Sequence, residues 1–175
     1  MRLLSNLFSG IKGDLILIAL IVGLFLLGEQ VVYAFTPISD IAVVVSSSMT
    51  HTNSTTFNQN FYGYLYSHNF TKSEIESWPF INGLNVGDLV IAFKTNPSDI
   101  KVGDIIIYKS PIGDIIHRVI FIYRNQSGYY FTTKGDANPA PIYPIEYNIS
   151  EKRVIGVVRI VIPYIGYPRY LLTLI

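Results

Sequence analysis

Three short segments of the chain carry the side chains that could do chemistry together. The run SSSM occupies 46–49, the run IIHRVIFIY places His117 among apolar residues, and the run TKGD at 133–136 ends in a carboxylate. A serine hydroxyl becomes a nucleophile when a neighbouring base accepts its proton, and a histidine oriented by a carboxylate is such a base. Each segment also has an ordinary interpretation, as a polar turn, a structural histidine and a Gly-Asp turn.

Of the three histidines, His117 is the most informative. His51 and His68 lie in the polar segment 50–85, where a solvated surface histidine is the usual case. His117 has apolar neighbours and precedes Arg118. An imidazole in such a place loses hydration unless it has a partner, so the pattern indicates a histidine with a specific contact.

The elements that must position these residues are mostly strands. From residue 41 onward, β-branched and aromatic runs alternate with Gly, Pro, Asn and Asp, which predicts a mainly β domain. The runs are IAVVV (41–45), LVIAF (89–93), IIIY (105–108), IIHRVIFIY (115–123) and YYFTT (129–133). The phrase VGD precedes two of them, at 86–88 and 102–104, which predicts that each begins at a Gly-Asp turn. NQSG at 125–128 predicts a hairpin loop.

The segment 50–85 differs from this pattern, because it is polar, rich in Asn and Tyr, and only weakly periodic. Thr71 and Glu74 have the spacing of a capping box, which predicts a short helix ending near Trp78. We interpret the segment as a surface insertion with a role in stability or in binding a partner, and we expect its aromatic side chains to pack the insertion.

Composition indicates a membrane anchor. Half of the 175 residues are hydrophobic and 14% are charged, against roughly a quarter charged in an average soluble domain. The range 15–35 is almost wholly apolar, and as a helix it would span about 30 Å. Arg2 and Lys12 precede it, so the charge bias predicts a cytoplasmic N-terminus over 1–14 and an extracytoplasmic domain over 36–162. Asn-x-Ser/Thr sequons at 53, 69, 125 and 148 all follow this predicted anchor.

The same composition excludes other classes of function. The net charge of +1 provides no basic surface for nucleic acid, and the absence of cysteine removes disulfides, cysteine nucleophiles and thiolate metal sites. The C-terminal range 163–175 is apolar again. Because it contains prolines, we interpret it as an interfacial segment and leave a truncated second membrane helix as the alternative.

In this order and spacing, the segments resemble signal peptidase I of the archaeal and endoplasmic-reticulum type. The resemblance runs through the predicted anchor and covers most of the chain except 50–85. It is carried by VSSSM (45–49), GDLV (87–90), IKVGDIIIY (100–108), IHRVI (116–120), TKGDAN (133–138) and RVIG (153–156). It implies a β-rich catalytic domain behind a single transmembrane helix.

The resemblance also implies roles for individual residues. The family's nucleophile is the serine before the methionine, which is Ser48, and its oxyanion is held by the backbone N–H of that residue and by a hydroxyl that falls on Ser46. This branch of the family has a histidine base where bacterial relatives have lysine, and that position is His117. Lys109 and Lys134 are then not bases, since a Ser–Lys mechanism needs an uncharged, desolvated lysine.

The chain departs from the family at the third member of the triad. The family usually has a second aspartate after the Gly-Asp pair, and that position is Ile142 here. Three alternatives follow: Asp136 orients His117, the enzyme is a Ser–His dyad, or the chain is inactive. Glu146 is the nearest spare carboxylate.

The resemblance implies a membrane-anchored serine endopeptidase that removes signal peptides through an acyl-enzyme, with no metal or organic cofactor. The expected partners are preprotein signal peptides, membrane lipid and the protein translocation channel. Two rivals stay open at this point: an inactive family member that acts as a binding or assembly subunit, and an anchored pilin-like surface protein, suggested by Lys12-Gly13 before an apolar helix.

Overall fold

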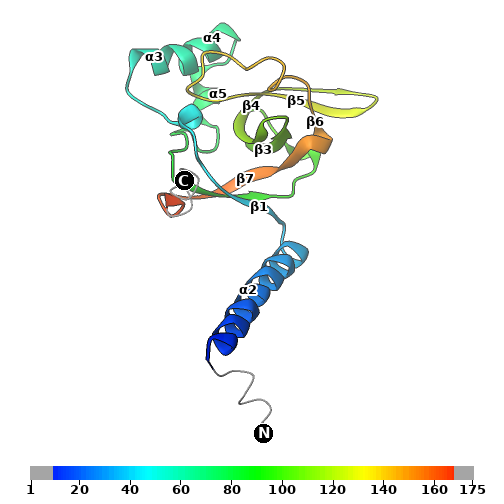
Figure 1. The fold of residues 1–175 in the computed structure, drawn as a ribbon. Helices are drawn as coiled ribbons and strands as arrows, with labels where there is room; N and C mark the ends of the chain where they lie inside the picture. The colour runs from blue at the N-terminus through cyan, green and yellow to red at the C-terminus, as the bar shows by residue number, and fades with distance from the viewer. Residues whose placement is uncertain (1–9, 168–175) are drawn as a thin grey trace. The chain divides into compact units, whose positions relative to one another are not determined.

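The computed structural model of the chain describes residues 10–167, and the chain divides into two compact units, 1–38 and 39–175. The first unit contains the helix α2 (Gly10–Phe35), which includes the predicted anchor (Figure 1). Leucine, isoleucine and valine side chains between Leu15 and Val31 are exposed along it. Within the described residues, however, no helix has both the length and the apolar character needed to cross a membrane. The predicted range is therefore helical, but its membrane span is not supported.

The second unit is built on one sheet of seven strands, in the order β1-β2-β7-β3-β4-β5-β6 (Figure 1). Every strand pair whose register is resolved is antiparallel. The strands are β1 (Ile38–Val43), β2 (Leu89–Phe93), β3 (Ile105–Ser110), β4 (Gly113–Asn125), β5 (Gly128–Lys134), β6 (Ile149–Ser150) and β7 (Val154–Ile162). The mainly β fold predicted from the sequence is therefore confirmed.

The repeated VGD phrase forms the same turn twice. Gly87 and Gly103 have φ angles of 87° and 96°, in the left-handed region that glycine adopts without strain. In each turn the aspartate Oδ2 accepts a backbone N–H three residues earlier, at 2.8 Å for Asp88 and 2.9 Å for Asp104. β2 and β3 then begin directly after these turns. The two turns do not indicate which strands pair: β2 and β3 are not neighbours in the sheet, because β7 lies between them.

Apolar side chains of β3 alternate between two hydrophobic clusters. Ile105 and Ile107 pack with a cluster that includes Met49, and Ile106 and Tyr108 pack with a cluster that includes Phe131. All of these side chains are almost fully buried, and each such burial stabilises the fold by about 1.5–3 kcal/mol. Because Met49 belongs to the first cluster, the residue that follows Ser48 is fixed by the core.

The segment 50–85 contains more helix than its sequence indicated. It forms α3 (Thr55–Asn58), the π-helical turn η2 (Gln59–Gly63), α4 (Tyr64–Ser67) and α5 (Lys72–Glu76), which lie together at one end of the sheet (Figure 1). Phe57, Phe61 and Leu65 recur every fourth residue and are buried against Ile120 of β4. This period is the helical signal in the segment. The predicted capping box at the start of α5 is present.

Three single-turn 3-10 helices complete the described part: η1 (Ser47–Met49), η3 (Pro97–Asp99) and η4 (Glu151–Arg153). After β7 the chain makes a turn over 163–167, in which the Tyr164 N–H donates to Asp88 Oδ1 at 3.3 Å. The interfacial segment predicted over 163–175 lies outside the described residues from 168 onward.

Candidate active site

Ser48 lies on the turn η1 (Ser47–Met49), which begins a few residues after the strand β1 (Ile38–Val43). The backbone of Ser46 is still extended, with φ −127° and ψ 159°, and the chain then tightens into the 3-10 turn. The side chain of Met49 is buried, and its carbonyl accepts the N–H of Leu84 at 2.8 Å. A half-buried serine is thus held on a turn that is anchored on its C-terminal side.

His117 lies on β4 and its Nε2 is 2.9 Å from Ser48 Oγ. The histidine is 6% exposed, so this ring has lost most of its hydration and depends on its two side-chain partners. Its Nδ1 contacts Oε1 of Glu146. A carboxylate can only accept, so Nδ1 carries the proton, and Nε2 is then the nitrogen that accepts from the Ser48 hydroxyl.

Glu146 is fully buried and both of its carboxylate oxygens are engaged. Oε1 accepts from His117, and Oε2 accepts the N–H of Ile142 at 2.6 Å. The backbone of the same residue returns the contact, since the Glu146 N–H donates to the Ile142 carbonyl at 2.9 Å, and the Glu146 carbonyl accepts from the Thr133 N–H of β5 at 2.9 Å. These bonds fix the carboxylate under the imidazole. From the sequence, Glu146 is only the nearest spare carboxylate, and no local signal marks it as the partner of His117.

Asp136 is not paired with His117. Its carboxylate accepts two hydrogen bonds from Arg118, at 2.9 Å from Nε and 2.7 Å from Nη2, and its Oδ2 is 2.8 Å from Nε2 of His51. Burial tends to raise the pKa of Asp136, but the Arg118 charge and the bonds from His51 and Arg118 hold the pKa below its ordinary value. The expectation that Asp136 orients His117 does not match these contacts, because the carboxylate is already occupied by a guanidinium.

Arg118 uses all five of its N–H donors in this buried cluster. Besides Asp136, it donates to the carbonyl oxygens of Pro79, Phe80 and Gly103, at 2.8, 3.0 and 2.9 Å. Three separate parts of the chain are therefore joined by one side chain. We refer to Arg118, Asp136 and His51 as the ion-pair cluster, and to Ser48, His117 and Glu146 as the serine group.

Ser46, predicted to help hold an oxyanion, lies beside the nucleophile. The two hydroxyl oxygens of Ser46 and Ser48 are 3.1 Å apart. A hydroxyl at this distance from the attacking oxygen can turn to donate to a negative charge that develops nearby. The structure therefore brings together Ser46, Ser48 and His117 of the predicted site.

Lys109 and Lys134, which the resemblance excludes as bases, differ in their surroundings. Lys109 is exposed on β3. Lys134 is buried, and its Nζ donates to the carbonyl oxygens of Gly135 and Asp136 at 3.0 and 3.1 Å, above the ring of Tyr64. Burial lowers the pKa of Lys134 to about 8, so the expectation that this lysine is not desolvated is wrong. It is still not placed as a base, because Ser48 Oγ contacts His117 and Ser46 while Nζ is bonded to backbone carbonyls. Its ammonium thus holds the turn before Asp136.

A groove of about 620 Å³ opens at Ser48. It runs between the edge strand β1, which contributes residues 40–43, and the start of β4, and most of its lining is aliphatic. Ile112 at the tip of the β3–β4 hairpin and Ile142 both line it with largely exposed side chains. An extended peptide fits such a groove, because a strand edge provides backbone hydrogen bonds and the aliphatic walls favour apolar side chains. Within residues 10–167, no three acidic or histidine side chains are grouped so that they could hold a metal ion.

Comparison with known proteins gives partial matches. No protein-family model matches the chain. It is 36% identical over 76 residues to the signal peptidase complex catalytic subunit of Schizosaccharomyces pombe, a match that covers 39% of this chain and 40% of that protein. The subunit of the same name in Schizophyllum commune is 35% identical over 105 residues, which cover 46% of this chain and 53% of that protein.

An uncharacterised protein of Methanocaldococcus jannaschii is also similar, with 40% identity over 77 residues that cover 42% of this chain and 38% of that protein. The chain thus spans about half the length, or less, of the curated relatives that it matches. Over the part that they cover, the two fungal matches confirm the resemblance of this chain to signal peptidase I of the endoplasmic-reticulum and archaeal type.

Proposed function

We propose that the chain is a serine endopeptidase that removes signal peptides from secreted preproteins. The observation that carries this proposal is the serine group: Ser48 Oγ lies 2.9 Å from His117 Nε2, and the opposite nitrogen of the same ring contacts the buried Glu146. A nucleophile, a base and an orienting carboxylate in this sequence of contacts are what acyl transfer requires. The fungal relatives supply the class of substrate.

The reaction follows from these contacts. Ser48 Oγ attacks the carbonyl carbon of the scissile peptide bond while His117 Nε2 accepts the hydroxyl proton. The tetrahedral oxyanion accepts hydrogen bonds from the Ser48 N–H and the Ser46 hydroxyl. The imidazolium then gives its proton to the leaving amine, and the acyl-enzyme is hydrolysed by a water that His117 activates in the same way.

In this mechanism Glu146 takes the role that was expected of Asp136. Its carboxylate keeps the proton on Nδ1, so that Nε2 is free to accept, and it stabilises the imidazolium that forms after attack. The isoleucine at the family's aspartate position is then compatible with activity, because Ile142 contributes its backbone N–H to Glu146 rather than a side-chain acid.

The groove at Ser48 is proposed to bind the end of the signal peptide as an extended strand along β1. A location at a membrane, with the N-terminus in the cytoplasm, and contact with a translocation channel stay predictions from the sequence. For these parts of the proposal, the only support from the fungal relatives is that their names place them in a signal peptidase complex.

The test is preprotein cleavage by the full chain, compared between wild type, Ser48→Ala and the neighbouring control Ser47→Ala. Ser47 is exposed on the same turn, so its change removes a hydroxyl without touching the serine group. We expect wild type and Ser47→Ala to cleave, Ser48→Ala to be inactive, and a fluorophosphonate probe to label Ser48 in the first two. Cleavage by Ser48→Ala at the wild-type rate would refute the proposal. Absence of both cleavage and labelling in wild type would favour an inactive assembly subunit.

A further inference from the structure

The turn at 135–138 lies between the serine group and the segment 50–85. The Ala137 N–H donates to the carbonyl of Ser48 at 2.8 Å, and the Ala137 carbonyl accepts from the side-chain amide of Asn60 at 2.9 Å. The nucleophile and a residue of the π-helical turn η2 are therefore connected through the backbone of one residue. Displacing Asn60 would release one end of this connection.

The same turn also contacts the base. Gly135 packs so closely against the imidazole that a Cβ placed there would lie 2.9 Å from His117 Nε2. A side chain at this position would collide with the atom that accepts the serine proton. The turn thus touches Ser48 through Ala137 and His117 through Gly135, and its position affects the geometry of both.

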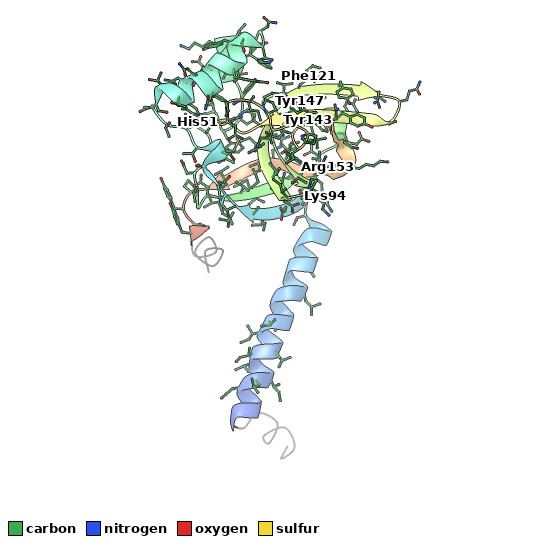
Figure 2. The ribbon with its side chains drawn as sticks, turned by 45° about the horizontal axis from the view of Figure 1, so that its top comes forward. His51, Lys94, Phe121, Tyr143, Tyr147 and Arg153 are labelled. Carbon is green, nitrogen blue, oxygen red and sulfur yellow. The ribbon has the colours of Figure 1, made fainter. Side chains whose placement is uncertain are left out.

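Segment 50–85 holds this turn at further points. His51 binds the Asp136 carboxylate at 2.8 Å, and its ring packs against both Phe57 and Phe61, with ring centroids 4.4 and 4.8 Å away. Figure 2 shows His51 on the side of the helical segment that faces the sheet. The ring of Tyr64 lies 5.2 Å from the Lys134 ammonium, which donates to the carbonyl oxygens of Gly135 and Asp136 in the turn. These contacts come from buried or half-buried residues and not from a solvated loop.

We propose that segment 50–85 positions the turn at 135–138 relative to Ser48 and His117, and that Asn60 is the residue through which the segment acts. The inference rests on the proposed peptidase function, and it adds a positioning role to the expectation of a surface insertion that contributes to stability or binds a partner. Asn60 touches neither substrate nor the reacting atoms. It acts through Ala137, which bonds to the carbonyl of Ser48, and so it sets the distance between nucleophile and base.

A positioning role has a different signature from a structural one. A single neutral hydrogen bond at a half-buried site contributes only about 1 kcal/mol to stability. A displacement of about 1 Å between reacting groups can cost about 100-fold in rate. Loss of Asn60 should therefore reduce the rate of acylation with little effect on the melting temperature or on substrate binding.

The experiment compares Asn60→Leu with Asn58→Leu in the full chain. Leucine is close to asparagine in size and cannot donate to the Ala137 carbonyl. Asn58→Leu is the matched control, because it is the same substitution two residues earlier, at an exposed position. We expect Asn60→Leu to lower kcat for preprotein cleavage and the rate of fluorophosphonate labelling by a similar factor of about ten, with KM unchanged. Asn58→Leu should match wild type in all three.

Hydrogen exchange of the peptides that cover 46–50 and 135–138 gives a readout that does not depend on activity. Exchange should accelerate in Asn60→Leu and not in Asn58→Leu. Equal rates and equal exchange in the two variants would overturn the inference, and so would a loss of kcat that only follows a fall in melting temperature. If wild type neither cleaves nor reacts with the probe, the peptidase proposal fails, and unchanged exchange in Asn60→Leu would separately refute the connection through Ala137.

Discussion

His117 and Arg118 are neighbours on β4, and each is paired with a buried carboxylate, yet the two pairs belong to different parts of the molecule. His117 faces the groove, where it meets Ser48 and Glu146. Arg118 faces the segment 50–85, where it meets Asp136 and three backbone carbonyls. Successive side chains of a strand point to opposite faces, so adjacent residues serve the serine group and the ion-pair cluster separately.

The partner of Arg118 explains why Asp136, the carboxylate of the Gly-Asp motif, does not contact His117. Asp136 follows β5 and is bound on both oxygens by a guanidinium, which is the geometry that planar Arg–carboxylate pairs prefer. Glu146 comes from a less regular stretch between β5 and β6. Its carboxylate contacts His117 and not a guanidinium. In the proposed mechanism this leaves it to orient an imidazole that gains a positive charge during the reaction.

The largest expected effect is on the catalytic rate, and it distinguishes the two carboxylates when each is replaced by its amide. Glu146→Gln should lower kcat by about 10⁴-fold, because an amide donor at Nδ1 favours the wrong histidine tautomer. Asp136→Asn should lower kcat far less. Single-turnover cleavage across a range of pH measures both, and the pH dependence of the rate should change only in Glu146→Gln.

Glu146→Asp serves as the conservative control and should recover part of the rate. If Asp136→Asn were as slow as Glu146→Gln and altered the pH dependence in the same way, the division between the two carboxylates would be wrong.

The second effect is on stability and concerns the ion-pair cluster. Arg118→Met should reduce the free energy of unfolding by about 3–5 kcal/mol, since it leaves the buried Asp136 carboxylate without its main counter-charge. Urea unfolding of the full chain measures this. Arg124→Met on the same strand is the control, because Arg124 is exposed and its loss should cost less than about 1 kcal/mol.

The double variant Arg118→Met with Asp136→Asn should lose less stability than the sum of the two single changes, because no unpaired charge is left. Strict additivity would mean that the two side chains do not interact as the structure indicates.

The smallest effect is a pH dependence of stability from Lys134, which supports the turn beside the ion-pair cluster. Its pKa is about 8 in the folded chain because of burial, against 10.5 for an unperturbed lysine. Between these values the unfolded chain binds more protons than the folded chain, so the free energy of unfolding should rise with pH over this window and be insensitive to Lys134 below it.

Urea unfolding at pH 7.5, 9 and 10 should show this rise in wild type relative to Lys134→Met. A constant difference between the two proteins across this range would mean that Lys134 titrates normally.

Much of the fold was predictable because it depends on local patterns. β-Branched runs mark the strands, and the two VGD phrases mark the turns that begin β2 and β3. The helices over 55–67 were missed, although Phe57, Phe61 and Leu65 have a helical period, because polar and aromatic residues between them hide it. The pairing of β7 with β2 and β3 joins residues far apart in the chain, and no local pattern encodes it.

For the site, the sequence by itself shows a serine run after an apolar segment and a histidine within one, and the resemblance to a known family then selects Ser48 and His117 from these runs. The choice of Glu146 over Asp136, and the contact of Asn60 with Ala137, were decided only by the tertiary structure. Both depend on which face of β4 each partner reaches and on which buried charge Arg118 neutralises. Those are long-range packing outcomes, in which the cost of leaving a buried group unpaired selects the final arrangement.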